Sequence, residues 1–279
     1  MSYLDKYIIY KNKYLALKNN MTGGADESIK EFLGTTENIP YTMTKESYTM
    51  KDNMLHLVKI KLNDDDSMPV LFVLAGMSHK SFVGTSSIII SKLTELKTKF
   101  SSIYLLEYDS FKEMQNFACG RRDELKAKSK KDIYKPELKM NTLIAKNIDS
   151  IIKKLKLKNI HLLGKCNGGW IILLMLLRSK QYTGLYLAVP GIPHGVDILQ
   201  KINKKRLKEI NFVFGWTKQD GFLFHWGQKS FQEKERYDKM MKDMKITYIS
   251  EMYDNNMTED PKIYHEVSPQ LIDTIIKSL

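Results

Sequence analysis

The 279-residue chain is poor in cysteine and has no long apolar run. Its two cysteines, Cys119 and Cys166, are too few for a disulfide framework, which argues against a small secreted scaffold. No apolar run reaches the roughly 18 residues of a membrane-spanning helix. The first residues are too charged for a secretory signal. We therefore expect an intracellular protein without a transmembrane segment.

The sequence also lacks the spacings that are typical of metal and nucleotide sites. The six histidines and two cysteines form no C-x-x-C or H-x-x-x-H pair. No G-x-G-x-x-G follows an apolar run, and no phosphate-binding P-loop is present. We expect no metal and no cofactor.

Acidic residues are outnumbered, and the formal net charge is +12. Most of the positive charge is lysine, spread over every segment, which is typical of a solvated surface. The arginines are Arg121, Arg122, Arg178, Arg206 and Arg236. Because no nucleic-acid-binding module accompanies these charges, we expect no specific nucleic-acid partner. Electrostatic attraction to nucleic acid or to an anionic membrane is the alternative.

Apolar runs alternate with amphipathic helical stretches along the chain, and apolar residues make up 43% of it. The strands predicted from these runs are 47–50, 55–62, 69–75, 103–107, 160–163, 185–189, 211–214 and 246–250. The helices predicted between them are 88–96, 142–157, 170–177, 196–207, 230–244 and 268–279. This order predicts one α/β domain over residues 35–279, with a mostly parallel central sheet and helices on both faces.

Residues 1–34 precede this pattern and are predicted to form a separate amphipathic leader. Tyrosine, leucine and isoleucine recur there at helical spacing between lysines, and Gly23-Gly24 ends the stretch. The motif KYxxYKxKYLxLK followed by GG resembles a leader found on many proteins of giant DNA viruses. The resemblance implies a viral protein located in the host cytoplasm or the virion. The alternatives are a short docking helix, a frayed tail, a processing or packaging tag, or a membrane-surface helix.

The strongest motif lies in residues 159–177, NIHLLGKCNGGWIILLMLL. An apolar strand runs into a turn that is rich in glycine, and an apolar helix follows. Cys166 stands at the tip of the turn, between Gly164 and Gly168. A strand, a tight turn and a helix with a Ser or Cys at the tip form a nucleophile elbow. The helix dipole behind the tip favours a thiolate and, later, an oxyanion.

GKCNGG in this setting resembles the α/β-hydrolase family in its version with a cysteine nucleophile, as in dienelactone hydrolases. The resemblance implies a triad in the chain order nucleophile, acid, base, each at the carboxyl end of a strand. Cys166 matches the nucleophile, Asp220 the acid and His265 the base. Asp254 and Asp260, in the loop before His265, are alternatives for the acid.

The family resemblance also implies an oxyanion hole made of two backbone N–H groups, those of Met77 and Asn167. The chain departs from the family at Ala75, where histidine is common, but a backbone donor does not depend on that side chain. The candidates for lining the substrate pocket are His79, Trp216 and His225. Residues 191–210 leave no room for a large lid domain.

These features predict a hydrolase of a small carboxylic ester, lactone or thioester that acts through a covalent acyl-enzyme on Cys166. A cysteine nucleophile favours substrates with good leaving groups, including activated esters and thioesters. The alternative is a catalytically silent α/β-hydrolase fold that serves as a binding or virion protein.

Overall fold

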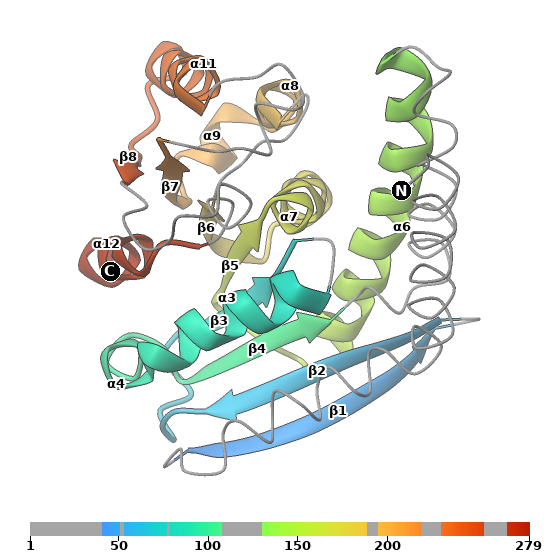
Figure 1. Cartoon of the computed structure of the whole chain (residues 1–279), viewed down its shortest axis with the longest axis vertical. Coiled ribbons are helices and arrows are strands. Elements are labelled where there is room, and N and C mark those ends of the chain that lie inside the picture. The colour runs from blue at the N-terminus through green and yellow to red at the C-terminus, as the bar shows by residue number, and fades with distance from the viewer. Residues whose placement is uncertain are drawn as a thin grey trace, which may run out of the picture.

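The computed structural model describes residues 41–50, 53–76, 79–107, 130–188, 195–218, 230–253 and 267–279 (Figure 1). The leader over residues 1–34 lies outside these residues, so the leader and the domain boundary at residue 35 stay predictions.

The described strands form one eight-stranded sheet in the order β1-β2-β4-β3-β5-β6-β7-β8. Their bounds are β1 Thr42–Met50, β2 Asn53–Lys61, β3 Val70–Leu74, β4 Ser102–Glu107, β5 Ile160–Lys165, β6 Tyr182–Ala188, β7 Asn211–Thr217 and β8 Ile249–Tyr253. The pairs β1–β2 and β2–β4 are antiparallel, and the other neighbours are parallel. The predicted mostly parallel sheet is confirmed, and its antiparallel pairs lie at the end formed by the first two strands.

Helices cover both faces of this sheet (Figure 1). Their bounds are α3 His79–Ser91, α4 Leu93–Leu96, α6 Lys130–Lys154, α7 Asn167–Arg178, α8 Gly195–Gln200, α9 Lys204–Leu207, α11 Ser230–Asp243 and α12 Pro269–Ser278. Helices α3, α4 and α12 pack on one face, and the other five pack on the opposite face. No helix in the described part of the chain is long and apolar enough to cross a membrane.

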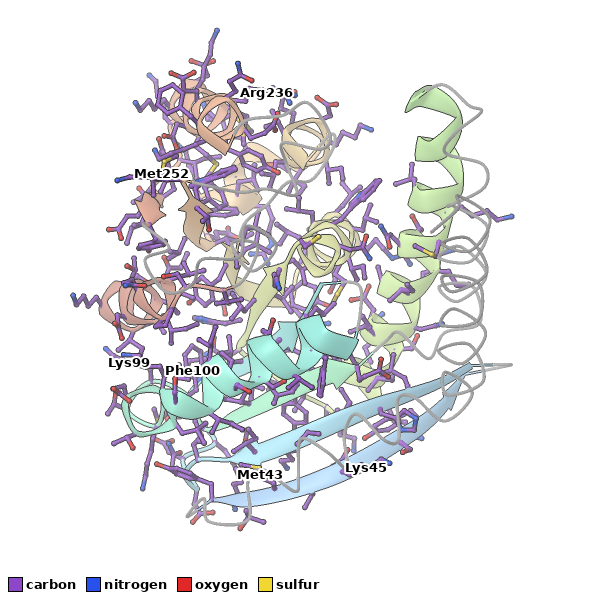
Figure 2. All side chains as sticks on the ribbon, in the orientation of Figure 1. Met43, Lys45, Lys99, Phe100, Arg236 and Met252 are labelled. Atoms are coloured by element: carbon purple, nitrogen blue, oxygen red, sulfur yellow. The ribbon has the colours of Figure 1, made fainter. Side chains whose placement is uncertain are left out.

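The central strands are apolar on both sides because each face lies beneath helices. In β3, Leu71 and Val73 pack toward α3, whereas Phe72 and Leu74 pack toward α6 and α7. This alternation follows from the two-residue repeat of a strand and accounts for the near-continuous apolar run. The side chains fill the space between the sheet and both helix layers (Figure 2).

Several elements differ from the predicted bounds. Helix α3 begins at His79 and α6 at Lys130, well before the predicted starts at 88 and 142. The first part of α3 contains Gly84, Thr85 and Ser86, which are weak helix formers, so its local sequence does not indicate a helix. The predicted helix over 196–207 is two helices, because Asn203 caps α9 by accepting the Lys205 N–H at 2.8 Å.

The strand bounds near the chain end also differ. β7 continues to Thr217 instead of ending at 214, and β8 begins at Ile249 instead of 246.

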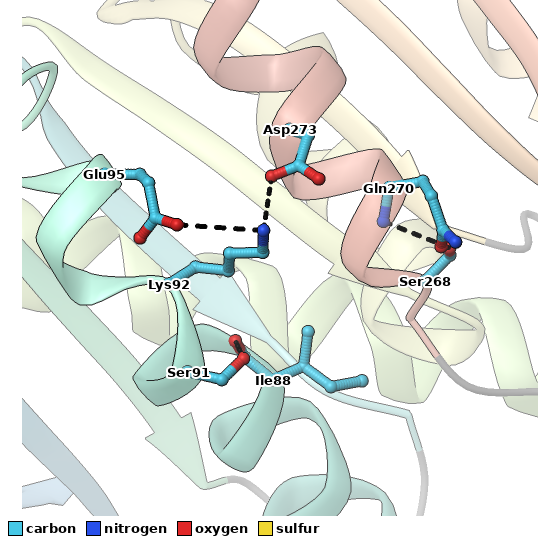
Figure 3. A network of polar contacts seen from close by, with 7 residues as sticks. All are labelled: Ile88, Ser91, Lys92, Glu95, Ser268, Gln270 and Asp273. Atoms are coloured by element: carbon cyan, nitrogen blue, oxygen red, sulfur yellow. Dashed lines mark hydrogen bonds and ion pairs between the residues drawn. The ribbon is translucent and has the colours of Figure 1, made fainter. Parts of the chain in front are cut away.

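A network of polar contacts holds the last helix on the face of α3 and α4, where Lys92 pairs with Asp273 of α12 at 2.6 Å (Figure 3). At the start of α12, Ser268 accepts the Gln270 N–H at 3.3 Å (Figure 3).

Candidate active site

The turn between β5 and α7 has the backbone of a nucleophile elbow. Cys166 adopts φ 51° and ψ −121°, a conformation that L-residues rarely take because Cβ crowds the backbone. Strained residues of this kind cost roughly 1–3 kcal/mol and concentrate at functional sites. Cys166 is partly exposed and is the N-cap of α7. Its N–H donates to the Ala188 carbonyl at 3.3 Å, which ties the tip to β6.

Two glycines make this tight turn sterically feasible. A Cβ at Gly164 would lie 2.7 Å from the carbonyl oxygen of Gly168. A Cβ at Gly168 would lie 2.8 Å from the carbonyl carbon of Leu74 and closer still to the carbonyl oxygens of Leu74 and Ala75. All these neighbours are backbone atoms, so they cannot rotate away. The pattern G-x-C-x-G therefore reflects close approach of β5, α7 and the end of β3.

The same packing brings the end of β3 to the N-terminus of α7. Ala75 and Gly76, which follow β3, are buried beside the elbow. The N–H of Asn167, one of the two predicted oxyanion donors, belongs to the first residue of α7. The first N–H groups of a helix have no partner within it and favour negative charge. Met77, the other predicted donor, lies outside the described residues.

A reciprocal amide pair anchors the start of α7 to α6. Asn141 Nδ2 donates to Asn167 Oδ1 at 2.9 Å, and Asn167 Nδ2 donates to Asn141 Oδ1 at 3.2 Å. Asn141 is fully buried and Asn167 is 5% exposed. The sequence analysis missed Asn141, although it interrupts the apolar face that includes Ile144 and Ile148 of α6. A buried polar residue on such a face normally has a specific partner.

Two buried charged residues lie at the carboxyl ends of the strands near the elbow. Leu74 pairs with Leu106 of β4 and with Gly164 of β5, so the next residues, Glu107 and Lys165, flank Ala75. Glu107 is 3% exposed and Lys165 is 2% exposed. The sequence indicated Glu107 as a strand end at the active edge but gave no role to Lys165.

The strands that precede the predicted acid and base end at the same edge of the sheet as Cys166. The predicted acid and base themselves lie outside the described residues. β7 and β8 run parallel to β5, so their carboxyl ends lie at the same edge of the sheet as Cys166. The Lys218 N–H donates to the Tyr253 carbonyl at 3.2 Å, which joins the two strand ends. Asp220, His265 and the alternative acids Asp254 and Asp260 lie outside the described residues.

The pocket candidates have different outcomes. Trp216 is fully buried in β7, packs edge-on against Tyr237, and donates its Nε1–H to Ser250 at 3.1 Å. Trp216 thus lies in the part of β7 that extends beyond the predicted strand end at 214, and its role in lining the pocket stays a prediction. His79 is the first residue of α3, and His225 lies outside the described residues.

His161, inside β5, is a packing residue, as its place in the strand predicts. Its Nδ1 lies 2.6 Å from the hydroxyl of Tyr186, and its ring fills the space left by the missing side chain of Gly184. Burial lowers the pKa of His161 from 6.5 to about 4, so the imidazole is neutral near pH 7. A base at the nucleophile must therefore come from elsewhere in the chain.

The structure resembles solved α/β-hydrolases over most of its length. Carboxylesterase CesB from Bacillus subtilis matches with a TM-score of 0.55 and 11% identity, covering 91% of this chain and 97% of that one. Naproxen esterase from Bacillus subtilis matches with a TM-score of 0.53 and 10% identity, covering 91% and 95%. Dienelactone hydrolase from Anabaena variabilis matches with a TM-score of 0.53 and 9% identity, covering 85% and 94%.

No protein-family model and no curated protein matches the sequence with significance. The likeness is therefore one of structure, and it establishes the α/β-hydrolase fold. Within that fold, Cys166 stands at the strand-to-helix elbow.

Proposed function

We propose that the protein hydrolyses a small carboxylic ester, lactone or thioester, with Cys166 as the nucleophile. The observation that carries the proposal is the backbone of Cys166, strained at φ 51° and ψ −121° between two glycines that touch backbone atoms. A structural cysteine in a core does not require such a turn. The fold is shared with carboxylesterases and a dienelactone hydrolase, which supports this reaction class.

In the proposed reaction, His265 takes the thiol proton and Asp220 orients the imidazole. The Cys166 sulfur attacks the acyl carbon, and the N–H groups of Met77 and Asn167 stabilise the oxyanion. The bond to the leaving alcohol or thiol breaks, and His265 protonates that group. Water then gives a proton to His265 and attacks the thioester, which releases the carboxylic acid and restores Cys166.

The test is to expose the full chain briefly to an activated ester such as p-nitrophenyl acetate, and then to measure intact mass and a peptide map. We expect one acetyl group on Cys166 and none on Cys119, which is the internal control. Cys166→Ala should abolish the adduct, and His265→Ala should slow its formation by about 100-fold or more, since general bases contribute 10²–10⁴-fold. Equal labelling of both cysteines, or none, would contradict an activated nucleophile and would leave the fold as a binding scaffold.

A further inference from the structure

The connections that lead from helices into parallel strands meet at the edge of the sheet opposite Cys166. Cys166 follows the carboxyl end of β5, whereas these connections precede the amino ends of β5 to β8. Two hydrogen bonds hold this amino edge together. Thr183 Oγ1 donates to Asn159 Oδ1 at 2.8 Å, and Asn211 Nδ2 donates to Ser278 Oγ at 3.1 Å. Segments far apart in the sequence therefore form one continuous surface there.

Exposed lysines occur in every one of these connections or in the helix turn before it. We call this set, together with Lys277 in the last turn of α12, the lysine edge: Lys153, Lys156, Lys158, Lys180, Lys201, Lys204, Lys205, Lys208, Lys242 and Lys245. In the ranges 153–159, 178–181, 201–210, 242–248 and 276–279, the acidic side chains are those of Glu209 and Asp243. The surface is thus strongly positive.

The nearby acids are mostly engaged by arginine rather than by lysine. Glu209 lies 3.6 Å from Arg206, and the buried Asp149 lies 3.6 Å from Arg178 while accepting the hydroxyl of Tyr182. Among the described residues, no carboxylate forms an ion pair with a member of the lysine edge. Most of the positive charge of this surface is therefore not paired within the described part of the fold, although Lys153 acts electrostatically on Asp149.

Two helix starts that are described near the opposite edge carry acidic side chains as well as basic ones. The first turns of α11 alternate Glu233, Lys234, Glu235 and Arg236, and three of these form ion pairs along the helix: Glu233 with Arg236, and Lys234 with Asp238. Helix α8 carries Asp197 in its first turn.

Two exposed apolar side chains distinguish between a lipid surface and a nucleic acid as the anionic partner. The exposed large hydrophobic residues in the described part of the chain are Leu177, Phe231 and Leu279. Leu177 (41% exposed) lies in the last turn of α7 and Leu279 (39% exposed) follows α12, so both lie at the amino edge among the lysines. Leucines gain free energy in a lipid interface but have no partner on duplex phosphates. Single-stranded nucleic acid would need exposed aromatic platforms instead.

We propose that the lysine edge docks the protein on an anionic phospholipid surface. Each lysine is a point charge on a long apolar stem, which suits lipid headgroups at varied positions. Docking through this edge turns the elbow at Cys166 away from the membrane, so substrate reaches it from water. The docking does not depend on any chemistry at Cys166.

The test is co-sedimentation of the full chain with phosphatidylcholine vesicles that contain or lack phosphatidylserine. We expect binding only to the anionic vesicles, weakening as salt rises. Lys158→Gln/Lys204→Gln should bind about 30-fold more weakly, because each lysine near an anionic surface contributes about 1 kcal/mol and 1.4 kcal/mol is a factor of ten. The matched control Lys139→Gln/Lys146→Gln removes two exposed lysines from the shaft of α6 and should bind as the parent does.

A second variant separates lipid from nucleic acid. Leu177→Ser keeps every charge and should weaken vesicle binding while leaving retention on duplex DNA unchanged. The proposal is overturned if anionic vesicles are not bound at about 0.1 M salt, where the Debye length is about 10 Å. It is also overturned if the control pair loses as much binding as the lysine-edge pair. Tighter binding to duplex DNA than to vesicles, with no effect of Leu177→Ser, would assign the edge to nucleic acid instead.

Discussion

The amide pair between α6 and α7 offers the sharpest test of how the fold supports the elbow. Asn141→Ala removes both hydrogen bonds of the pair, at 2.9 and 3.2 Å, and leaves the amide of Asn167 buried without its partner. An unsatisfied buried polar group costs about 1–3 kcal/mol, and two groups are orphaned here. We therefore expect the free energy of unfolding to fall by about 2–6 kcal/mol.

The same substitution should slow acylation of Cys166, because it loosens the residue whose backbone N–H is the proposed oxyanion donor. Losing one such donor lowers kcat by about 10²–10³-fold, so a displaced donor should lower it by about 10–100-fold with little change in KM. Urea unfolding reports the stability, and the single-turnover rate with an activated ester reports the chemistry.

A double-variant cycle provides the control for this prediction. Asn141→Ala/Asn167→Ala removes both partners, so its stability should be higher than the sum of the single losses predicts, by about 1–3 kcal/mol. The unfolding measurement stands even if the chain is not a hydrolase. Single losses that add without coupling, or an Asn141→Ala protein as stable as the parent, would refute the anchoring role.

Three further predictions follow from described residues. Gly168→Ala should destabilise the protein by about 3 kcal/mol or more in urea unfolding, since its Cβ would overlap the carbonyl groups of Leu74 and Ala75; parent-like stability would contradict the elbow packing. Burial lowers the pKa of His161 from 6.5 to about 4, so the unfolded chain binds this proton more tightly than the folded chain does. The contribution of the neutral His161 to stability should therefore be complete above pH 6.5, and the free energy of unfolding should fall by up to about 3 kcal/mol as the pH falls toward 4. His161→Asn should flatten that part of the stability–pH curve, and an unchanged slope would exclude His161 as its source. Trp216→Phe should lower the free energy of unfolding without changing KM for an ester, because Trp216 is fully buried and its indole N–H bonds to Ser250. A changed KM would instead support the predicted role of Trp216 in lining the substrate pocket.

The sequence alone predicted the features whose residues are contiguous. The strand, the turn and the helix around Cys166 lie within one short stretch. The positions where a Cβ would clash with the backbone therefore appear in the sequence as glycines beside Cys166. The buried strands were equally visible, because a strand covered on both faces is apolar at every position. These signals led to the α/β-hydrolase fold, which the structural comparisons confirm.

Features that join distant segments required the tertiary structure. Asn141 and Asn167 meet only because α6 packs beside α7. Trp216 is buried because β8 pairs with β7 and Tyr237 of α11 packs against the Trp216 ring. Lysines that seem scattered along the chain gather at one edge because parallel strands all begin there. Local sequence carries steric and hydrophobic preferences between near neighbours, whereas the meeting of remote side chains depends on the order and direction of the strands.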